Sequence, residues 1–142
     1  MTQKQTEIVR STWALVAAMD PIVVGNLFYA HLFEIAPQLK PMFRNPVDEQ
    51  SKKLLAMINY VITKLDRLNS ILSEIAKLAQ RHSTYGVKAE HYAIVGEALL
   101  WTLEKGLVDK WNEETKEAWT ACYTILANAM IEAAGETTSK AA

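Results

Sequence analysis

The sequence predicts one all-α domain of six to eight helices that pack orthogonally. Glycine and proline are scarce, with five and four residues among 142, where average usage gives about 17 together. Apolar residues recur at three- and four-residue spacing over nearly the whole chain, and no long segment alternates apolar and polar residues as a half-buried strand would. The expected helices are unequal in length, and a short proline-bounded piece interrupts them. A regular four-helix bundle has similar helices and short loops, so the pattern favours orthogonal packing.

The first third of the chain carries every proline, and the prolines predict its helix boundaries. A first helix is expected over about residues 4–19. Pro21 suits the first turn of a second helix over about 21–35. Pro37 begins a short piece that ends near Phe43, and a loop around Pro46 follows. This third is therefore predicted to be punctuated, and the rest to be free to form long helices.

The remaining residues predict four further helices. One carries apolar residues from Leu54 to Leu65, and one runs from Ile71 to near His82, with Gly86 just beyond it. Two longer helices are expected over about 89–107 and 113–134. The domain therefore spans residues 1–134, and the small polar tail 135–142 is expected to fray.

Composition excludes several classes of protein. The formal net charge of −1 gives no field that would attract nucleic acid or an acidic membrane. A single cysteine rules out an internal disulfide. No apolar run reaches the roughly 20 residues of a membrane span, and the N-terminus lacks the apolar stretch of a secretory signal. We therefore expect a cytoplasmic protein that binds neither nucleic acid nor membrane.

The chain carries no set of side chains that would catalyse a reaction without a cofactor. The sequence has no His-Glu-x-x-His motif, and it lacks the two Glu-x-x-His motifs of a di-iron bundle. Phosphate-binding loops, dinucleotide-binding glycine motifs and nucleophile elbows are missing from the sequence. Cys122 lies in an apolar helical stretch and is expected to be buried and inert. Any chemistry must therefore come from a cofactor.

Several segments together resemble single-domain globins. Residues 26–33, followed by Pro37 and Phe43, resemble the second helix and the corner after it. Residues 79–87, followed by 91–100, are similar to the region of the haem-linked histidine, and Glu117-Ala118-Trp119 with Tyr123 is similar to the last helix. The resemblance covers about residues 5–134. It is strongest to bacterial single-domain haemoglobins and the globin half of flavohaemoglobins, with neuroglobin-like features in residues 95–100.

The resemblance implies a globin fold around haem b, iron protoporphyrin IX, and a role for individual residues. His82 matches the proximal iron ligand, while Tyr29 and Gln50 match distal donors of hydrogen bonds to a bound gas. The other matching positions are the haem-stacking Phe43, the basic Lys53 and Arg81 near the propionates, and the pocket residues Leu54, Leu78, Val87, Tyr92, Val95 and Leu126. His31 and His91 match no ligand position and are expected at the surface or its boundary. Taken singly, each of these residues is also explained by packing or by helix hydrogen bonds.

The function that the resemblance implies is reversible, high-affinity binding of oxygen, with carbon monoxide and nitric oxide as further ligands. Storage, transport or scavenging of oxygen would use such a site. One alternative is a nitric oxide dioxygenase that detoxifies nitric oxide with electrons from an external reductase, and another is a gas sensor that acts through a partner. A haem-free interaction module is the rival from a different class. Against the dioxygenase, these 142 residues hold no flavin domain, and Ala134 stands where flavohaemoglobins carry a glutamate, with Glu132 on another helix face.

Overall fold

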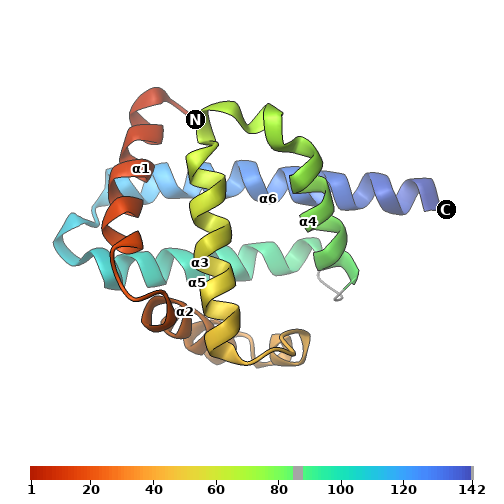
Figure 1. The fold of residues 1–142 in the computed structure, drawn as a ribbon, viewed down its shortest axis with the longest axis horizontal. Helices are drawn as coiled ribbons and strands as arrows, with labels where there is room; N and C mark the ends of the chain where they lie inside the picture. The colour runs from red at the N-terminus through yellow and green to blue at the C-terminus, as the bar shows by residue number, and fades with distance from the viewer. Residues whose placement is uncertain (85–87, 142) are drawn as a thin grey trace.

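Helices account for all the regular secondary structure in the computed structural model, which describes residues 1–84 and 88–141 (Figure 1). Within these ranges, the side chains of residues 68, 69, 83, 84 and 134–141 are not described. The elements in chain order are α1 (Gln3–Ala17), α2 (Pro21–Ile35), the 3₁₀ helix η1 (Pro37–Met42), α3 (Val47–Thr63), η2 (Leu65–Ile71), α4 (Leu72–Thr84), α5 (Ala89–Leu107), η3 (Val108–Lys110) and α6 (Glu113–Ala141). The all-α prediction is confirmed.

Capping side chains set the first helix boundaries. The Thr2 hydroxyl accepts a hydrogen bond from the Gln5 backbone N–H, and the Gln5 side chain accepts one from the Thr2 N–H, which forms a capping box. Asp20 caps α2 by accepting a hydrogen bond from the Ile22 N–H at 2.9 Å, with Pro21 in the first turn. Helix α1 ends at Ala17, two residues before the expected end, and Ala18 is its C-cap.

Several helices cross one another, while α5 and α6 run alongside each other (Figure 1). Figure 1 shows α3 passing in front of α5 and α6. Helix α4, which follows α3 after the 3₁₀ helix η2, also crosses α6. The larger core lies where α1, α3, α5 and α6 meet, and Trp13 and Trp119 pack in it with ring centroids 6.1 Å apart. Each indole N–H has a partner: Trp13 donates to Asn59 Oδ1 and Trp119 donates to Thr12 Oγ1. Both large aromatic residues are therefore buried without losing a hydrogen bond.

A second core joins α2, η1 and α5. Its buried residues are Phe28, Tyr29, Leu32, Ala36, Leu39 and Ala98. Half-buried side chains complete it, among them Phe43 directly after η1, Leu54 of α3 and Val95 of α5. This second core contains most of the distal residues that the globin resemblance singles out.

Two glycines allow helices to approach closely. A Cβ on Gly25 in α2 would collide with Cβ of Ser51 in α3, and Ser51 is fully buried. A Cβ on Gly96 in α5 would lie 2.6 Å from the ring of Tyr123 in α6. The α2–α3 and α5–α6 crossings therefore depend on the missing side chain at these positions.

Two segments differ from the sequence-based expectation. Residues 65–71 form the 3₁₀ helix η2, with Arg67 in a non-helical conformation inside it, where the sequence predicts the end of one helix at Leu65, a connection over 66–70 and the start of the next helix at Ile71. Helix α6 continues as backbone helix to Ala141, beyond the expected end near residue 134. None of the described helices is by itself long and apolar enough to cross a membrane, although α1 and α2, bent by 108°, meet that test as a pair.

Candidate functional site

His82 lies in the last turn of α4 with one ring nitrogen fixed. Its Nδ1 is 2.8 Å from the backbone carbonyl oxygen of Leu78. Because a carbonyl oxygen only accepts, Nδ1 must carry a proton, and in the neutral ring Nε2 is then the nitrogen with the lone pair. Nε2 has no hydrogen-bond partner among the described residues. The hydrogen bond therefore fixes the orientation of the half-buried imidazole and selects, for its neutral form, the tautomer with the proton on Nδ1.

Tyr29 lies in α2 inside a cluster of aromatic rings. Its ring centroid is 5.0 Å from that of Phe28, 6.0 Å from that of Phe33 and 5.3 Å from that of Phe43. The residue is only 6% exposed, and burial raises its pKa to about 12. The phenol therefore stays protonated at neutral pH and is able to donate a hydrogen bond.

The Tyr29 hydroxyl has no hydrogen-bond partner among the described residues. In the same part of the chain, no completely enclosed side-chain nitrogen or oxygen lacks a partner. The hydroxyl oxygen of Tyr29 must therefore border accessible space, although its ring is buried. A buried phenol with a free donor at the edge of an apolar cluster fits a pocket for a polar ligand atom.

Helix α3 brings Gln50 and Leu54 to the same side of the molecule as this cluster. Leu54 packs against both cores, and Gln50, one turn earlier, is half-buried with no side-chain hydrogen bond to a described residue. Val95 of α5 packs on the Tyr29 cluster as well. The structure thus brings together Tyr29, Phe43, Leu54 and Val95, with Gln50 on the adjoining turn.

Tyr92 takes part in a contact between α5 and α6. Its backbone carbonyl accepts a hydrogen bond of 2.6 Å from the Tyr123 hydroxyl. Burial raises the pKa of both phenols, and for Tyr123 the neighbouring Tyr92 adds to the effect. The ring of Tyr123 also lies against Gly96, so it joins the first two turns of α5 to α6.

Other expected site residues lie apart from this group. Lys53 is exposed and sits 3.8 Å from Glu49 on its own helix, and Arg81 is exposed near the end of α4. Leu126 packs against the larger core. Leu78 is half-buried and contributes the carbonyl described above, and Val87 lies outside the described residues.

The two other histidines have structural partners. His31 stacks on Trp101 of α5 with ring centroids 3.9 Å apart and planes 4° apart. His91 accepts a hydrogen bond from the Lys88 backbone N–H at 3.0 Å and so takes part in capping α5. Both are half-buried, as a boundary position requires.

Sequence reasoning missed the residues that join α2 to α3. Ser51 donates a hydrogen bond of 2.8 Å to the Asn26 side-chain oxygen, and the Asn26 amide donates one of 3.0 Å to Asp48. The available signal was Gly25, an isolated glycine inside an apolar helix, which often marks close packing. Nothing in the pattern identifies its partner helix.

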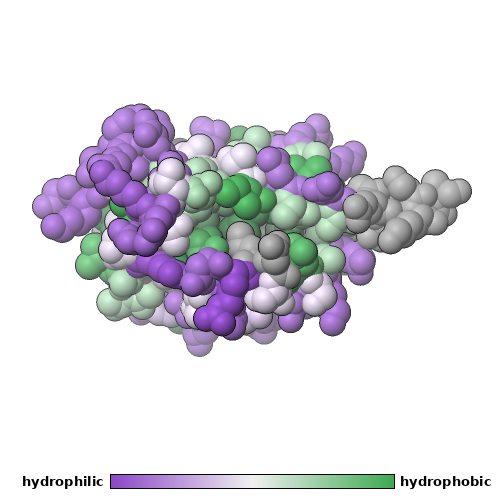
Figure 2. All heavy atoms as spheres, turned by 90° about the horizontal axis from the view of Figure 1, so that it is seen from above, coloured by the Kyte–Doolittle hydropathy of each residue, from purple (hydrophilic) through white to green (hydrophobic). Residues whose placement is uncertain are grey.

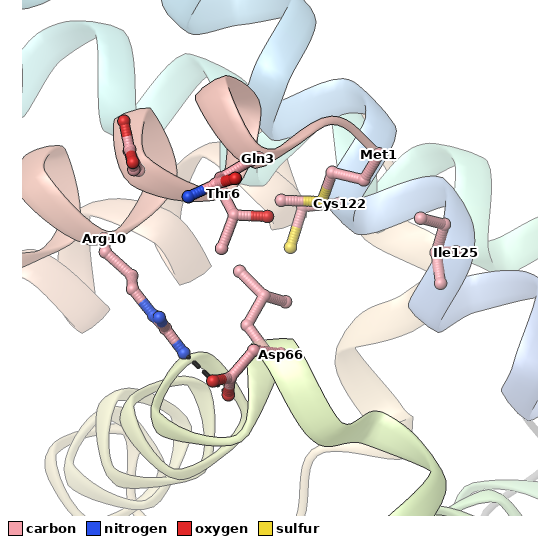
Figure 3. Close-up of a pocket in the computed structure, with 9 residues that line it drawn as sticks. Met1, Gln3, Thr6, Arg10, Asp66, Cys122 and Ile125 are labelled. Atoms are coloured by element: carbon pink, nitrogen blue, oxygen red, sulfur yellow. Dashed lines mark hydrogen bonds and ion pairs between the residues drawn. The ribbon is translucent and has the colours of Figure 1, made fainter.

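A pocket of about 460 Å³ lies elsewhere, between the start of α1, η2 and α6 (Figure 3). Leu65, Cys122 and Ile125 contribute apolar walls, and the Arg10–Asp66 ion pair, with an N–O distance of 3.0 Å, lies at its edge. Figure 2 shows apolar surface in the middle of the upper face, bordered by hydrophilic residues. Burial raises the pKa of Cys122 to about 11, so the thiol is protonated and unreactive at neutral pH. This pocket contains none of the site residues expected from the sequence.

The described residues fit a haem group. The imidazole of His82 offers one free nitrogen, fixed by the hydrogen bond of the other, and the phenol of Tyr29 offers a free donor beside apolar side chains. Iron in a haem requires such a neutral nitrogen ligand, and the porphyrin requires apolar surroundings. The described residues include no group of three or more histidine, cysteine or acidic side chains that could hold a metal ion without a porphyrin.

Comparisons with known proteins give the same assignment. The globin family model matches residues 26–130. A flavohemoprotein of Vibrio cholerae is 32% identical over 138 residues, which cover 95% of this chain and 35% of that protein. The chain thus spans about a third of the length of this relative. The structure of a bacterial globin from Campylobacter jejuni superposes with a TM-score of 0.85 at 28% identity, covering 97% of this chain and 99% of that one.

An engineered carbene transferase from Rhodothermus marinus, described as a putative nitric oxide dioxygenase, shares the fold. Its TM-score is 0.87 at 20% identity, over 98% of this chain and 96% of that one. The segment that the globin family model matches includes α3, α4 and α5, the helices that carry Gln50, His82 and Val95. The chain belongs to the globin family and has the fold of a haem-binding globin.

Proposed function

We propose that this globin holds haem b through His82 and binds oxygen reversibly with high affinity, for storage or scavenging. Haem iron supplies the affinity for oxygen, carbon monoxide and nitric oxide. The residues of the chain supply the fixed ligand, the donors beside the gas and the dry surroundings. The observation that carries the proposal is the Nδ1 hydrogen bond of His82 to the Leu78 carbonyl, which leaves Nε2 free.

The acceptor of that hydrogen bond favours binding over catalysis. A carboxylate beside Nδ1 would draw the proton away and make the imidazole a stronger electron donor. A backbone carbonyl is neutral, so the ring stays a neutral ligand. His82 has no acidic partner among the described residues, and Glu132 is exposed.

Tyr29 and Gln50 are proposed as the distal donors. Each side chain could donate a hydrogen bond to a polar gas ligand such as oxygen, which would slow its release, while carbon monoxide is less polar and would gain less. The buried, protonated phenol of Tyr29 is the stronger candidate, because its ring is held by three phenylalanines. Gln50 is only half-buried and flexible, so its contribution is expected to be smaller.

The test of this proposal is haem uptake by matched histidine variants. The protein expressed with haem should show a Soret band that shifts on reduction and again with carbon monoxide. His82→Ala should purify largely without haem and regain a haem spectrum with added imidazole, whereas His31→Ala and His91→Ala should retain it. A normal deoxy spectrum in His82→Ala would show that another residue holds the iron.

A nitric oxide dioxygenase with an external reductase is the second candidate. It is favoured by the similarity to a flavohemoprotein and by the Tyr29 and Gln50 pair. With oxygen, nitric oxide and an added reductase, this activity would give nitrate over many turnovers. Nitrate formation limited to about one turnover per haem, even with excess reductase, would favour oxygen binding as the function.

A further inference from the structure

We propose that Asn26 is a positioning residue that sets the place of Gln50, and through it the strength of oxygen binding. This inference rests on the proposed function, because it assigns a role relative to the distal donors. Asn26 itself has no expected contact with haem or gas.

The geometry begins at the closest helix approach in this region. Gly25 and Ser51 leave no room for a larger side chain between α2 and α3, and Ser51 is fully buried. At such a distance, any closer approach of α3 to α2 produces overlap. The contact therefore fixes the separation of the two helices, but a single contact does not fix how the first turn of α3 is rotated.

Asn26 supplies the missing constraint. Its side-chain oxygen accepts the hydrogen bond from Ser51, and its amide donates the one to Asp48. These two partners flank Gln50 in the first turn and a half of α3. One side chain on α2 thus holds α3 at two points on either side of the proposed donor.

The same side chain links the two donors to each other. Asn26 and Tyr29 are three residues apart on α2, so they lie on neighbouring turns of one helix. Tyr29 is already fixed by ring contacts, whereas Gln50 has no hydrogen bond to a described side chain. Loss of the Asn26 bridge should therefore displace Gln50 and leave Tyr29 in place.

An exchange of amide and carboxylate tests the bridge. Asn26→Asp places two carboxylates at the 3.0 Å contact with Asp48, and their repulsion should open the first turn. The double variant Asn26→Asp/Asp48→Asn restores a donor–acceptor pair with reversed direction, and the carboxylate still accepts from Ser51. Each variant is measured by the carbon monoxide stretching frequency of the ferrous carbonyl form and by the oxygen off-rate.

The expected result is a shift in the single variant and recovery in the double one. Asn26→Asp should move the stretching frequency in the same direction as Gln50→Leu and raise the oxygen off-rate about threefold to tenfold, since roughly one neutral hydrogen bond is lost. In the Gln50→Leu background, Asn26→Asp should have no further effect on either quantity. Asn59→Leu is the matched control: it removes another hydrogen bond between helices on α3, from Trp13, and should lower thermal stability alone.

Several results would overturn the inference. An unchanged stretching frequency in Asn26→Asp, despite lower thermal stability, would make Asn26 a purely structural residue. An undiminished effect in the Gln50→Leu background would show action through another group. An unchanged stretching frequency in Gln50→Leu would exclude Gln50 as a donor without affecting the proposal that the protein binds haem. A wild-type protein without a carbonyl band would refute the proposed function itself.

Discussion

Replacing Tyr29 by phenylalanine tests whether the Tyr29 hydroxyl donates a hydrogen bond to a bound gas or takes part only in core packing. The substitution keeps the ring and its contacts with Phe28, Phe33 and Phe43. It removes only a hydroxyl that has no partner among the described residues. The free energy of unfolding of the haem-free protein should therefore change by less than about 1 kcal/mol, because no hydrogen bond within the fold is lost.

The same substitution should change gas binding strongly. A hydrogen bond to a charged acceptor contributes about 1.5–3 kcal/mol, and about 1.4 kcal/mol corresponds to a factor of ten. The oxygen off-rate should therefore rise about tenfold to a hundredfold. The pKa of about 12 keeps the phenol protonated, so the wild-type off-rate should be constant from neutral pH to about pH 10.

Stopped-flow displacement of oxygen by carbon monoxide measures this off-rate. Tyr60→Phe is the matched control, because Tyr60 is an exposed tyrosine of α3 and its loss should alter neither rate nor stability. An unchanged off-rate in Tyr29→Phe would refute the assignment of the phenol to the gas. A loss of stability well above 1 kcal/mol would instead show that the hydroxyl has a partner within the fold.

Three other substitutions or conditions test the packing. Gly96→Ala should lower the free energy of unfolding by about 1–3 kcal/mol, as measured by urea denaturation, because the new Cβ would meet the Tyr123 ring at 2.6 Å; an unchanged midpoint would contradict that crossing. Val108→Gly should raise the melting temperature, because Val108 has a φ of 52° that glycine adopts without strain. The net gain in unfolding free energy should be about 1 kcal/mol, once the larger backbone entropy that glycine loses on folding is subtracted. A lower melting temperature would contradict this. Stability should fall as pH rises above about 9, since burial raises the pKa of Cys122 from 9.0 to about 11 and of Tyr29 from 10.0 to about 12. The burial of each neutral group stabilises the fold fully below the unfolded-state pKa of that group, and about 2–3 kcal/mol of unfolding free energy per group is lost as pH rises through its folded-state pKa. In urea titrations at rising pH, the stability of Cys122→Ala should therefore decline less steeply than that of wild type. An identical decline would exclude the thiol as a contributor.

Most of the fold is predictable because local signals agree. Pro21 and Pro37 begin helical segments where a missing N–H costs nothing, and spacing of apolar residues places α3, α5 and most of α6. The 3₁₀ helix over residues 65–71 was not predicted, because its short turns leave no clear periodicity in the sequence. The end of α6 at Ala141 was not predicted either, since small polar residues favour neither helix nor coil strongly.

The candidate site was predicted from a resemblance, and residue chemistry alone supports only part of it. His82 and Leu78 stand four residues apart on one helix, so a hydrogen bond between the His82 ring and the Leu78 carbonyl is a local contact that the sequence spacing allows. The stacking of His31 on Trp101, 70 positions later, and the contact of Asn26 with Ser51 depend on which helices meet, and no local pattern contains that information. The roles of His82, Tyr29 and Gln50 toward haem and gas stay predictions.

The hydrogen bond between His82 and Leu78 lies within a single helix, and this has a consequence for redesign. Donor and acceptor are carried by the same turn of α4, so they move together whenever the helix shifts or tilts. The tautomer of the imidazole is therefore a property of local secondary structure and is insulated from substitutions in the elements that pack around it. An engineer could rebuild the neighbouring face of α6 for stability or assembly and still transfer α4 with this hydrogen bond intact.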